Sequence, residues 1–309
     1  MKSRFLGVLV SSLWFHTAVS ADTLPDYIRY AEDAKTSRLE VAIRKFALPS
    51  GQNVDLIAVI HIADDAYYQR LNSRFPAYDS VLFELVGDPD RLTQSAPLTA
   101  EERKAQPVGS GVTYIQQSAS KYLHLTFQLG AIDYRGKNMV HADTSPAEFE
   151  KMQAERGETM LTLFTRAMQA QMNGSISSTA MNELDTFALI RILLSPNSAA
   201  EFKMALAKVF DQMESITAAM EGKNPSAILG GRNDVVMARL KEVLANRKQR
   251  KVAVFFGGGH MPGIERALVA DLKAKPVSEE WLAAWTMPKK PTTPPSDTTP
   301  APGTTKPSS

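Results

Sequence analysis

The amino-acid sequence predicts a mixed α/β fold, in which helices flank a central mixed β-sheet. Apolar runs at residues 54–60, 79–86 and 252–256 have the length of strands and are apolar enough to be buried on both faces. Stretches with helical periodicity alternate with these runs, as expected when helices cover a sheet. The length of 309 residues, less two non-globular ends, suits one large domain or two closely merged halves.

The N-terminus has the three parts of an export signal. Lys2 and Arg4 supply positive charge, residues 5–15 are mostly apolar, and residues 18–21 are the small side chains that a signal peptidase requires. Residues 1–21 are therefore predicted to be a cleaved signal peptide, and the mature chain to be exported, either periplasmic or secreted. An uncleaved anchor is the alternative, although the apolar stretch is shorter than the ~20 residues of a membrane span. No later segment is apolar and long enough to predict a transmembrane helix in the mature chain.

The C-terminal segment, residues 288–309, is rich in proline and threonine. It has almost no apolar side chains to bury, so it is predicted to be a disordered, partly polyproline tail. Such tails serve as spacers or targets for modification, or have no specific role. The folded domain is therefore predicted to span residues 22–287.

Composition and charge exclude several functional classes. The formal net charge is +2, and the one short basic run, residues 247–251, lies between a predicted helix and a predicted strand, as a solvated turn does. Nucleic-acid binders carry a clustered basic face, so we expect no nucleic-acid partner. The chain has no cysteine, which excludes disulfides, thiolate zinc sites and a cysteine nucleophile.

The first half of the folded region reads as alternating helices and strands. The turn residues between two of the strands make them a β-hairpin. The predicted elements are, in order, a helix at residues 26–36, a half-buried strand at 39–44, a turn at 49–53, a buried strand at 54–60, a helix at 66–75 and a buried strand at 79–86.

The second half is predicted to be mainly helical. A short strand at residues 139–141 precedes a helix that begins at Ser145-Pro146, and a helix after Arg232 precedes a buried strand at 252–256 and a last helix at 263–273. Residues 148–221 carry helical periodicity throughout. The methionines there are interpreted as adaptable core residues. The apolar residues at helical spacing are Met160, Leu163, Phe164, Met168, Met204, Val209 and Met213.

Two histidines occupy matching positions in the sequence. His61 ends the apolar run 56–61 before a helix, and His260 follows the apolar run 252–256 and three glycines before another helix. If the two strands are parallel, their carboxyl ends share one edge of the sheet, where α/β proteins bind ligands. One such histidine is more often a core residue, but neutral imidazole is also the commonest protein ligand for transition metals. The repetition favours a shared site.

Glu84 adds a carboxylate to this edge. It lies near the end of the buried run 79–86, where a charge is costly unless it is paired or bound to a metal. Two imidazoles and one carboxylate, with open positions for water, are typical ligands of a hydrolytic metal centre. His61, Glu84 and His260 are therefore predicted to hold a divalent ion, Mn, Co or Zn. The alternative is a buried ion pair between Glu84 and either Arg232 or Arg191.

Glycines and polar residues near two helix starts are further candidates. Gly257, Gly258 and Gly259 let the backbone approach a bound group because they have no Cβ, although a tight turn has the same requirement. Arg232 is predicted to stabilise an oxyanion or to hold a substrate carboxylate. Asn233 is predicted either to contact the bound group or to cap its helix.

Residues after the short strand at 139–141 are candidates for proton transfer. Asp143 is a catalytic candidate, and His141 is a weaker one. The alternative is that Asp143 or Thr144 caps the following helix. The sequence has no Gly-x-Ser-x-Gly motif, so nothing in it predicts a serine nucleophile elbow.

These residues, in this order and spacing, resemble the TraB/PrgY/GumN family, which includes the Tiki proteases of animals. The likeness covers residues 38–275 and includes residues 77–84 and 141–146. The residues that carry it are His61 after a strand, Glu84 after the next, Arg232-Asn233 at the start of a late helix, and Gly257 to His260. The family is marked by two Gly-x-x-His motifs, and the first departs here, since Ala58 stands where glycine is expected.

The resemblance implies a fold and an activity. The fold would be related to erythromycin esterase and to the ChaN haem-binding proteins, with two pseudo-symmetric halves around a mixed sheet. The activity would be similar to that of the Tiki metalloproteases, which depend on manganese or cobalt. Alanine is the smallest replacement for glycine, so we expect His61 to remain a ligand despite Ala58.

We therefore expect an exported, metal-dependent hydrolase that acts on a peptide or another small substrate. One alternative is a non-catalytic envelope protein that binds haem or a metal in the same cleft. Another is an interaction protein whose ancestral site is inactive and whose tail is the functional part, a view that Ala58 favours. Fold alone does not decide among these functions.

Overall fold

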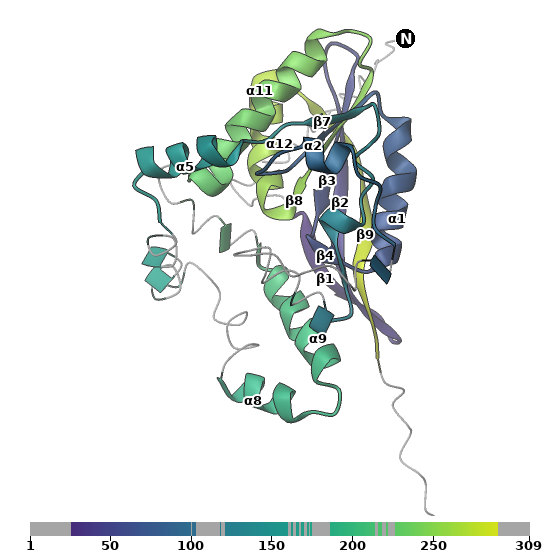
Figure 1. The fold of residues 1–309 in the computed structure, drawn as a ribbon, viewed down its shortest axis with the longest axis vertical. Coiled ribbons are helices and arrows are strands. Elements are labelled where there is room, and N and C mark those ends of the chain that lie inside the picture. Colours follow the sequence, from purple (N-terminus) through teal and green to yellow (C-terminus); the bar gives the residue numbers. More distant parts are fainter. Residues whose placement is uncertain are drawn as a thin grey trace, which may run out of the picture.

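The computed structural model describes residues 26–99, 121–159, 186–213 and 226–289, with the isolated positions 101–102, 118, 162, 165–166, 168–169, 172, 174, 216–217 and 221. The predicted signal peptide and the predicted tail beyond Lys289 lie outside these residues. The described part is a mixed α/β structure, as the sequence predicted, in which helices flank a seven-stranded sheet (Figure 1).

The central sheet combines a parallel and an antiparallel part. Its strands lie in the order β1-β2-β3-β8-β5-β7, and β9 pairs with β2 off this path. Strands β3, β8, β5 and β7 are parallel neighbours, whereas β1, β3 and β9 all pair antiparallel with β2. The strands are β1 (Ile28–Glu32), β2 (Thr36–Ala47), β3 (Asn53–Val59), β5 (Ser80–Phe83), β7 (Met139–His141), β8 (Lys251–Gly257) and β9 (Lys275–Pro288).

The parallel strands end at nearly the same level, which confirms the shared edge that the two histidine runs predicted. Val59 lies opposite Gly257, and Phe83 lies opposite Phe255. The residues of β3, β5 and β8 are almost all buried, because helices cover both faces of a parallel sheet. The ladder of hydrogen bonds therefore delivers the residues after these strands to one place.

The helix predicted at residues 26–36 is wrong, because these residues form β1 and the start of β2. Ile28 pairs with Val41 and Tyr30 with Leu39, so the long strand β2 supplies a partner that outweighs local helix propensity. The connection between the two strands turns at Asp33, whose side chain accepts hydrogen bonds from the backbone N–H groups of Lys35 and Thr36, both at 2.8 Å.

Strand β9 follows the last helix and was not predicted. It pairs with β2 along nearly the full length of both strands, from Thr36 opposite Pro288 to Ala47 opposite Lys275. Pro288 thus belongs to the sheet, and the backbone N–H of Lys289 still donates to the carbonyl of Lys35 at 2.8 Å. Strand β9 therefore includes the first residue of the predicted tail.

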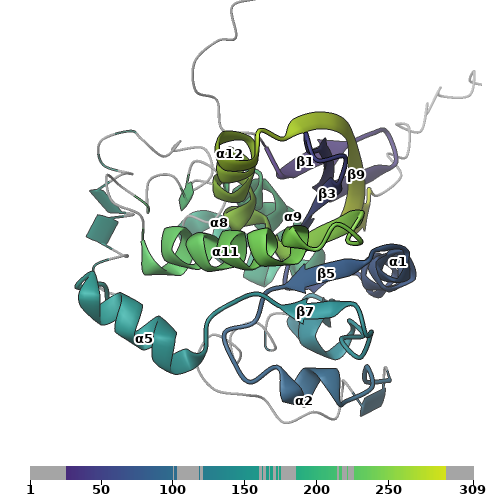
Figure 2. The same cartoon turned by 90° about the horizontal axis from the view of Figure 1, so that it is seen from above.

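Helices cover both faces of the sheet, as Figure 2 shows. Helix α1 (Asp65–Arg74) lies on one side, and α11 (Arg232–Ala245) and α12 (Met261–Leu272) lie on the other. All three confirm predicted helices. So does α5 (Pro146–Glu155), which begins with a capping box formed by Ser145 and Glu148.

The region predicted to be helical over residues 148–221 contains α5, α8 (Thr186–Leu194) and α9 (Ser198–Phe210). Met204 and Met213 pack partly buried against the core, as predicted, whereas Met168 is exposed. Met160, Leu163 and Phe164 lie outside the described residues. None of the helices in the described ranges is both long enough and apolar enough to cross a membrane.

Short elements complete the described part. A two-stranded sheet joins β4 (Ile62–Ala63) to β6 (Thr126–Phe127), directly after His61. A π-helical turn at η3 (Ala227–Gly231) leads straight into α11, a feature often found at functional sites. The other short elements are η1 (Phe75–Ala77), α2 (Asp90–Thr93), η2 (Gln128–Gly130) and η4 (Gly258–His260).

Candidate functional site

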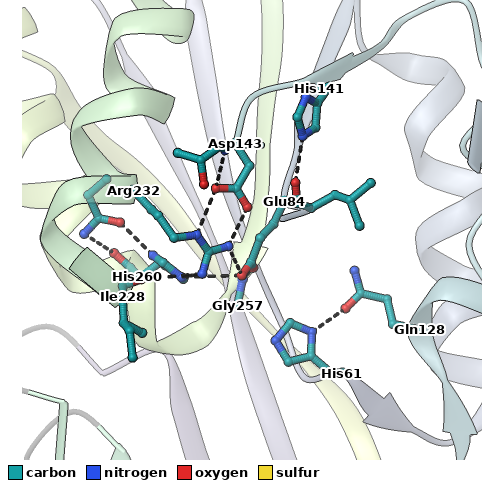
Figure 3. Close-up of polar contacts among 12 residues, drawn as sticks. His61, Glu84, Gln128, His141, Asp143, Ile228, Arg232, Gly257 and His260 are labelled. Carbon is teal, nitrogen blue, oxygen red and sulfur yellow. Dashed lines mark hydrogen bonds and ion pairs between the residues drawn. The ribbon is translucent and has the colours of Figure 1, made fainter. Parts of the chain in front are cut away.

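Side chains from three neighbouring strand ends converge at the edge of the parallel sheet (Figure 3). Glu84 directly follows β5, His61 follows β3, and His260 ends the short turn after β8. Glu84 and His260 are buried, whereas His61 is only partly buried. The structure thus brings together the three residues that the sequence assigned to one site.

Gly257 marks the point on which these side chains converge. A Cβ built on it would lie 3.2 Å from Oε2 of Glu84, 3.5 Å from Nε2 of His61 and 3.7 Å from Cδ2 of His260. A side chain at this position would therefore be in close contact with all three residues. Gly258 and Gly259 do not share this role, since Cβ atoms there would meet Ile28 and Thr217.

The Glu84 carboxylate is held from several sides. Its Oε2 accepts a hydrogen bond from the backbone N–H of Gly257 at 2.6 Å, and its Oε1 lies 2.6 Å from Nη2 of Arg232 and 3.4 Å from Nε2 of His260. Burial alone would raise the pKa of this carboxyl. The adjacent His260, Arg232 and His61 outweigh burial and hold the pKa well below its usual value of 4.5, so Glu84 is ionised.

Arg232, the first residue of α11, is enclosed by acceptors. Its Nε and Nη2 donate to the two oxygens of Asp143, at 2.8 and 2.5 Å, and Nη2 also donates to Glu84. Its Nη1 donates to Nε2 of His260 at 3.2 Å and to the carbonyl of Ile228 at 3.4 Å. A guanidinium has five N–H groups, and all of them are taken up by these contacts.

These contacts give Arg232 and Asp143 a structural role in the site. With every N–H engaged in the structure, Arg232 could serve the predicted oxyanion role only by giving up one of these contacts. The Asp143 side chain is fully buried against Arg232, and its Oδ1 also accepts from the backbone N–H of Thr144 at 2.8 Å. Arg232 thus contacts Glu84 and His260 directly, whereas Asp143 is linked to them through Arg232.

His141 lies beside the site without entering it. Its Nε2 is 2.7 Å from the carbonyl of Leu85, and its ring packs against Phe83. The ring thus holds the backbone that follows Glu84, and the structure gives no support to the weaker proposal that His141 transfers a proton.

An amide oxygen faces the Nδ1 atom of each site histidine. Oε1 of Gln128 lies 2.9 Å from Nδ1 of His61, and Oδ1 of Asn233 lies 2.8 Å from Nδ1 of His260. Asn233 thus contacts the site through His260, and α11 begins with no side-chain cap hydrogen bond. Anchoring one ring nitrogen in this way is typical of histidines that bind metals through the other.

Two imidazoles and a carboxylate are suitable ligands for a divalent ion. Whether His260 can join them depends on its contact with Arg232. Arg232, Glu84 and Asp143 together carry a net charge of −1 when the imidazoles are neutral, which favours a cation. However, no group of three His, Asp or Glu side chains in the described ranges is already arranged to hold an ion. Arg232 donates to Nε2 of His260, so a third ligand becomes available only when this contact is given up.

Sequence reasoning missed Gln128, Tyr134 and the Thr144 hydroxyl. Gln128 is buried, with 2% of its surface exposed, in a segment for which no element was predicted. The Thr144 hydroxyl is buried next to Asp143, with no hydrogen-bond partner among the residues that the structure describes. A glutamine or threonine in an irregular segment carries no periodic signal, so only the three-dimensional arrangement reveals these residues.

The glycine run offers a test of the convergence on Gly257. Gly257→Ala is expected to weaken divalent-ion binding by about 10- to 100-fold, because the new methyl group would press on the side chains of Glu84 and His61. Gly258→Ala is the matched control: its Cβ would press on Ile28, so it should lower stability by about 1 kcal/mol and leave ion binding unchanged. Calorimetric titration and urea unfolding measure the two effects, and equal ion binding by both variants would contradict the assignment.

Comparisons of this chain with protein-family models, with curated proteins and with solved structures found no match.

Proposed function

We propose that this protein is an exported hydrolase that uses a divalent ion, Mn, Co or Zn, to cleave a peptide or another small amide-like substrate. The observation that supports this most is the convergence of His61, Glu84 and His260 on Gly257. A partly exposed imidazole there lies beside an ionised, buried carboxylate. That combination is suited to activating water.

His61, Glu84 and His260 are the residues that would hold the ion. When bound, the ion supplies Lewis-acid activation of water and of the scissile carbonyl. The ionised Oε2 of Glu84, fixed by the Gly257 N–H, is placed to take a proton from water. Arg232 and Asp143 hold Glu84 in place and balance its charge in a site that excludes most solvent.

We further propose that the chain is a divergent member of the TraB/PrgY/GumN family, with the two pseudo-symmetric halves of an erythromycin esterase/ChaN-like fold. Two observations support the halves. Strands β3 and β8 are parallel neighbours, and each leads through a histidine to a helix, α1 or α12. Each histidine also has an amide oxygen at its Nδ1.

Titration calorimetry with Mn²⁺, Co²⁺ and Zn²⁺ tests the ion site. The wild-type protein should bind one ion per chain, and His61→Ala should reduce the affinity by at least about 100-fold, because one of three ligands is lost. His124→Ala is the matched control, since His124 is exposed and lies outside the site. If wild type binds none of the three ions, or His61→Ala binds them equally well, the metal site is excluded.

A metal-free hydrolase is the second candidate, and the contact of Arg232 with His260 favours it. In that arrangement His61 is the general base, with Nε2 accepting the proton of the attacking water. Hydrolysis of a peptide and ester panel separates the candidates: a chelator should abolish activity in the first case and leave it intact in the second. Equal rates for wild type and His61→Ala would contradict both.

A further inference from the structure

We propose that Gln128 and Tyr134 are positioning residues that hold His61 in the tautomer with the proton on Nδ1, which leaves the Nε2 lone pair beside Gly257 for the proposed ion. The purpose of this positioning depends on the proposed function. The contacts that indicate it do not.

Gln128 is tied to His61 through both backbone and side chain. Its backbone N–H donates to the carbonyl of His61 at 2.8 Å, and the adjacent residues Ile62 and Phe127 pair in the small sheet. Its side-chain Oε1 lies 2.9 Å from Nδ1 of His61 (Figure 3). The amide therefore has a fixed place relative to the ring.

Tyr134 contacts the other end of the Gln128 amide. Nε2 of Gln128 donates to the Tyr134 hydroxyl at 3.0 Å, and Oε1 lies toward His61. An amide oxygen only accepts hydrogen bonds, so Nδ1 of His61 must carry the proton. In a neutral imidazole the lone pair is then on Nε2, the atom near Gly257 and Glu84.

Tyr134, the residue of this contact series farthest from His61, is firmly packed. Tyr134 is 1% exposed, and its ring packs against Phe83 with centroids 4.9 Å apart. Phe83 is the residue immediately before Glu84. Burial raises the pKa of Tyr134, so its hydroxyl stays neutral at physiological pH. The same packed unit thus places both the carboxylate and, through Gln128, the imidazole.

The second histidine supports this interpretation independently. Nδ2 of Asn233 donates to the backbone carbonyl of His260 at 3.4 Å, so Oδ1 is the atom at Nδ1 of that ring. Both rings are therefore anchored by an uncharged acceptor. In both places the amide oxygen accepts at Nδ1, so the other ring nitrogen, Nε2, is the one that faces the site.

Long-range ¹H–¹⁵N spectra of protein labelled with ¹⁵N-histidine test the proposal without metal or substrate. At a pH of about 8, where imidazole is neutral, wild-type His61 should be almost entirely the Nδ1–H tautomer. Its signals are assigned by their loss in His61→Gln. Gln128→Met should let the Nε2–H tautomer appear. Tyr134→Phe, which removes one hydroxyl, should do the same to a smaller extent.

Tyr67→Phe is the matched control, because this buried hydroxyl donates to the carbonyl of Ala58 and makes no contact with His61 in the described structure. It should leave the tautomer unchanged. An Nε2–H tautomer in wild type, or an unchanged tautomer in both Gln128→Met and Tyr134→Phe, would overturn the proposal. If the ion site is also real, Gln128→Met should weaken ion binding by about 10- to 100-fold. A correct tautomer without ion binding would instead contradict the proposed function alone.

Discussion

Replacing Arg232 with methionine is expected to lower the free energy of unfolding by about 3–5 kcal/mol. The substitution keeps most of the side-chain length but removes the only cation that contacts both Glu84 and Asp143 in the described structure. Two buried carboxylates would then lie close together without compensation, and buried charges cost most when a partner is missing. Urea unfolding followed by circular dichroism measures the change.

Two further variants make this expectation specific. Arg239→Met lies in the same helix and removes an exposed pair with Glu242, so it should change stability by less than about 1 kcal/mol. Adding Glu84→Gln and Asp143→Asn to Arg232→Met should recover much of the loss, because the stranded charges are gone. If Arg232→Met is as stable as Arg239→Met, the buried ion network does not exist as described.

Glu84→Gln is expected to reduce hydrolysis by at least about 100-fold and to abolish binding of divalent ions. Glutamine keeps the shape of the side chain but cannot act as an anionic ligand or as a base. Arg232 retains its two contacts with Asp143, so the fold should persist. Rates on a metal-supplemented panel of peptide and ester substrates, with ion binding by calorimetry, measure the effect.

Asp55→Asn is the matched control for Glu84→Gln. Asp55 is also a buried carboxylate on a strand of the parallel sheet, but it lies toward the opposite end of β3 and accepts from the Tyr78 hydroxyl at 2.7 Å. It should keep wild-type rates and ion binding. A Glu84→Gln protein that retains full activity would show that this carboxylate takes no part in the chemistry.

The sequence predicts those parts of the fold that local pattern determines. Strands β3, β5 and β8 are apolar runs of strand length, and α1, α11 and α12 carry helical periodicity. Strands β1 and β9 have no comparable signal, because their conformation depends on β2. In the case of β9, that partner is remote in sequence. Long-range pairing of this kind overrides local propensity.

The candidate site was predictable in its members but only partly in their roles. Histidines after two matching strands, and a glutamate after a third, were sufficient to predict that His61, Glu84 and His260 lie together. The buried pair between Glu84 and Arg232 was an open alternative, and the structure contains it alongside the convergence. The sequence placed Asp143 near this site, but no sequence pattern indicates that its carboxylate and the Ile228 carbonyl accept from Arg232.

The pairing of β9 with β2 also has a consequence for how the chain is made. The last strand of the described part covers almost the whole of β2, so a nascent or truncated chain that stops before Lys275 leaves that long edge open. An open edge recruits other strands and promotes aggregation. Completion of the sheet therefore waits until the segment that contains β9 has been synthesised.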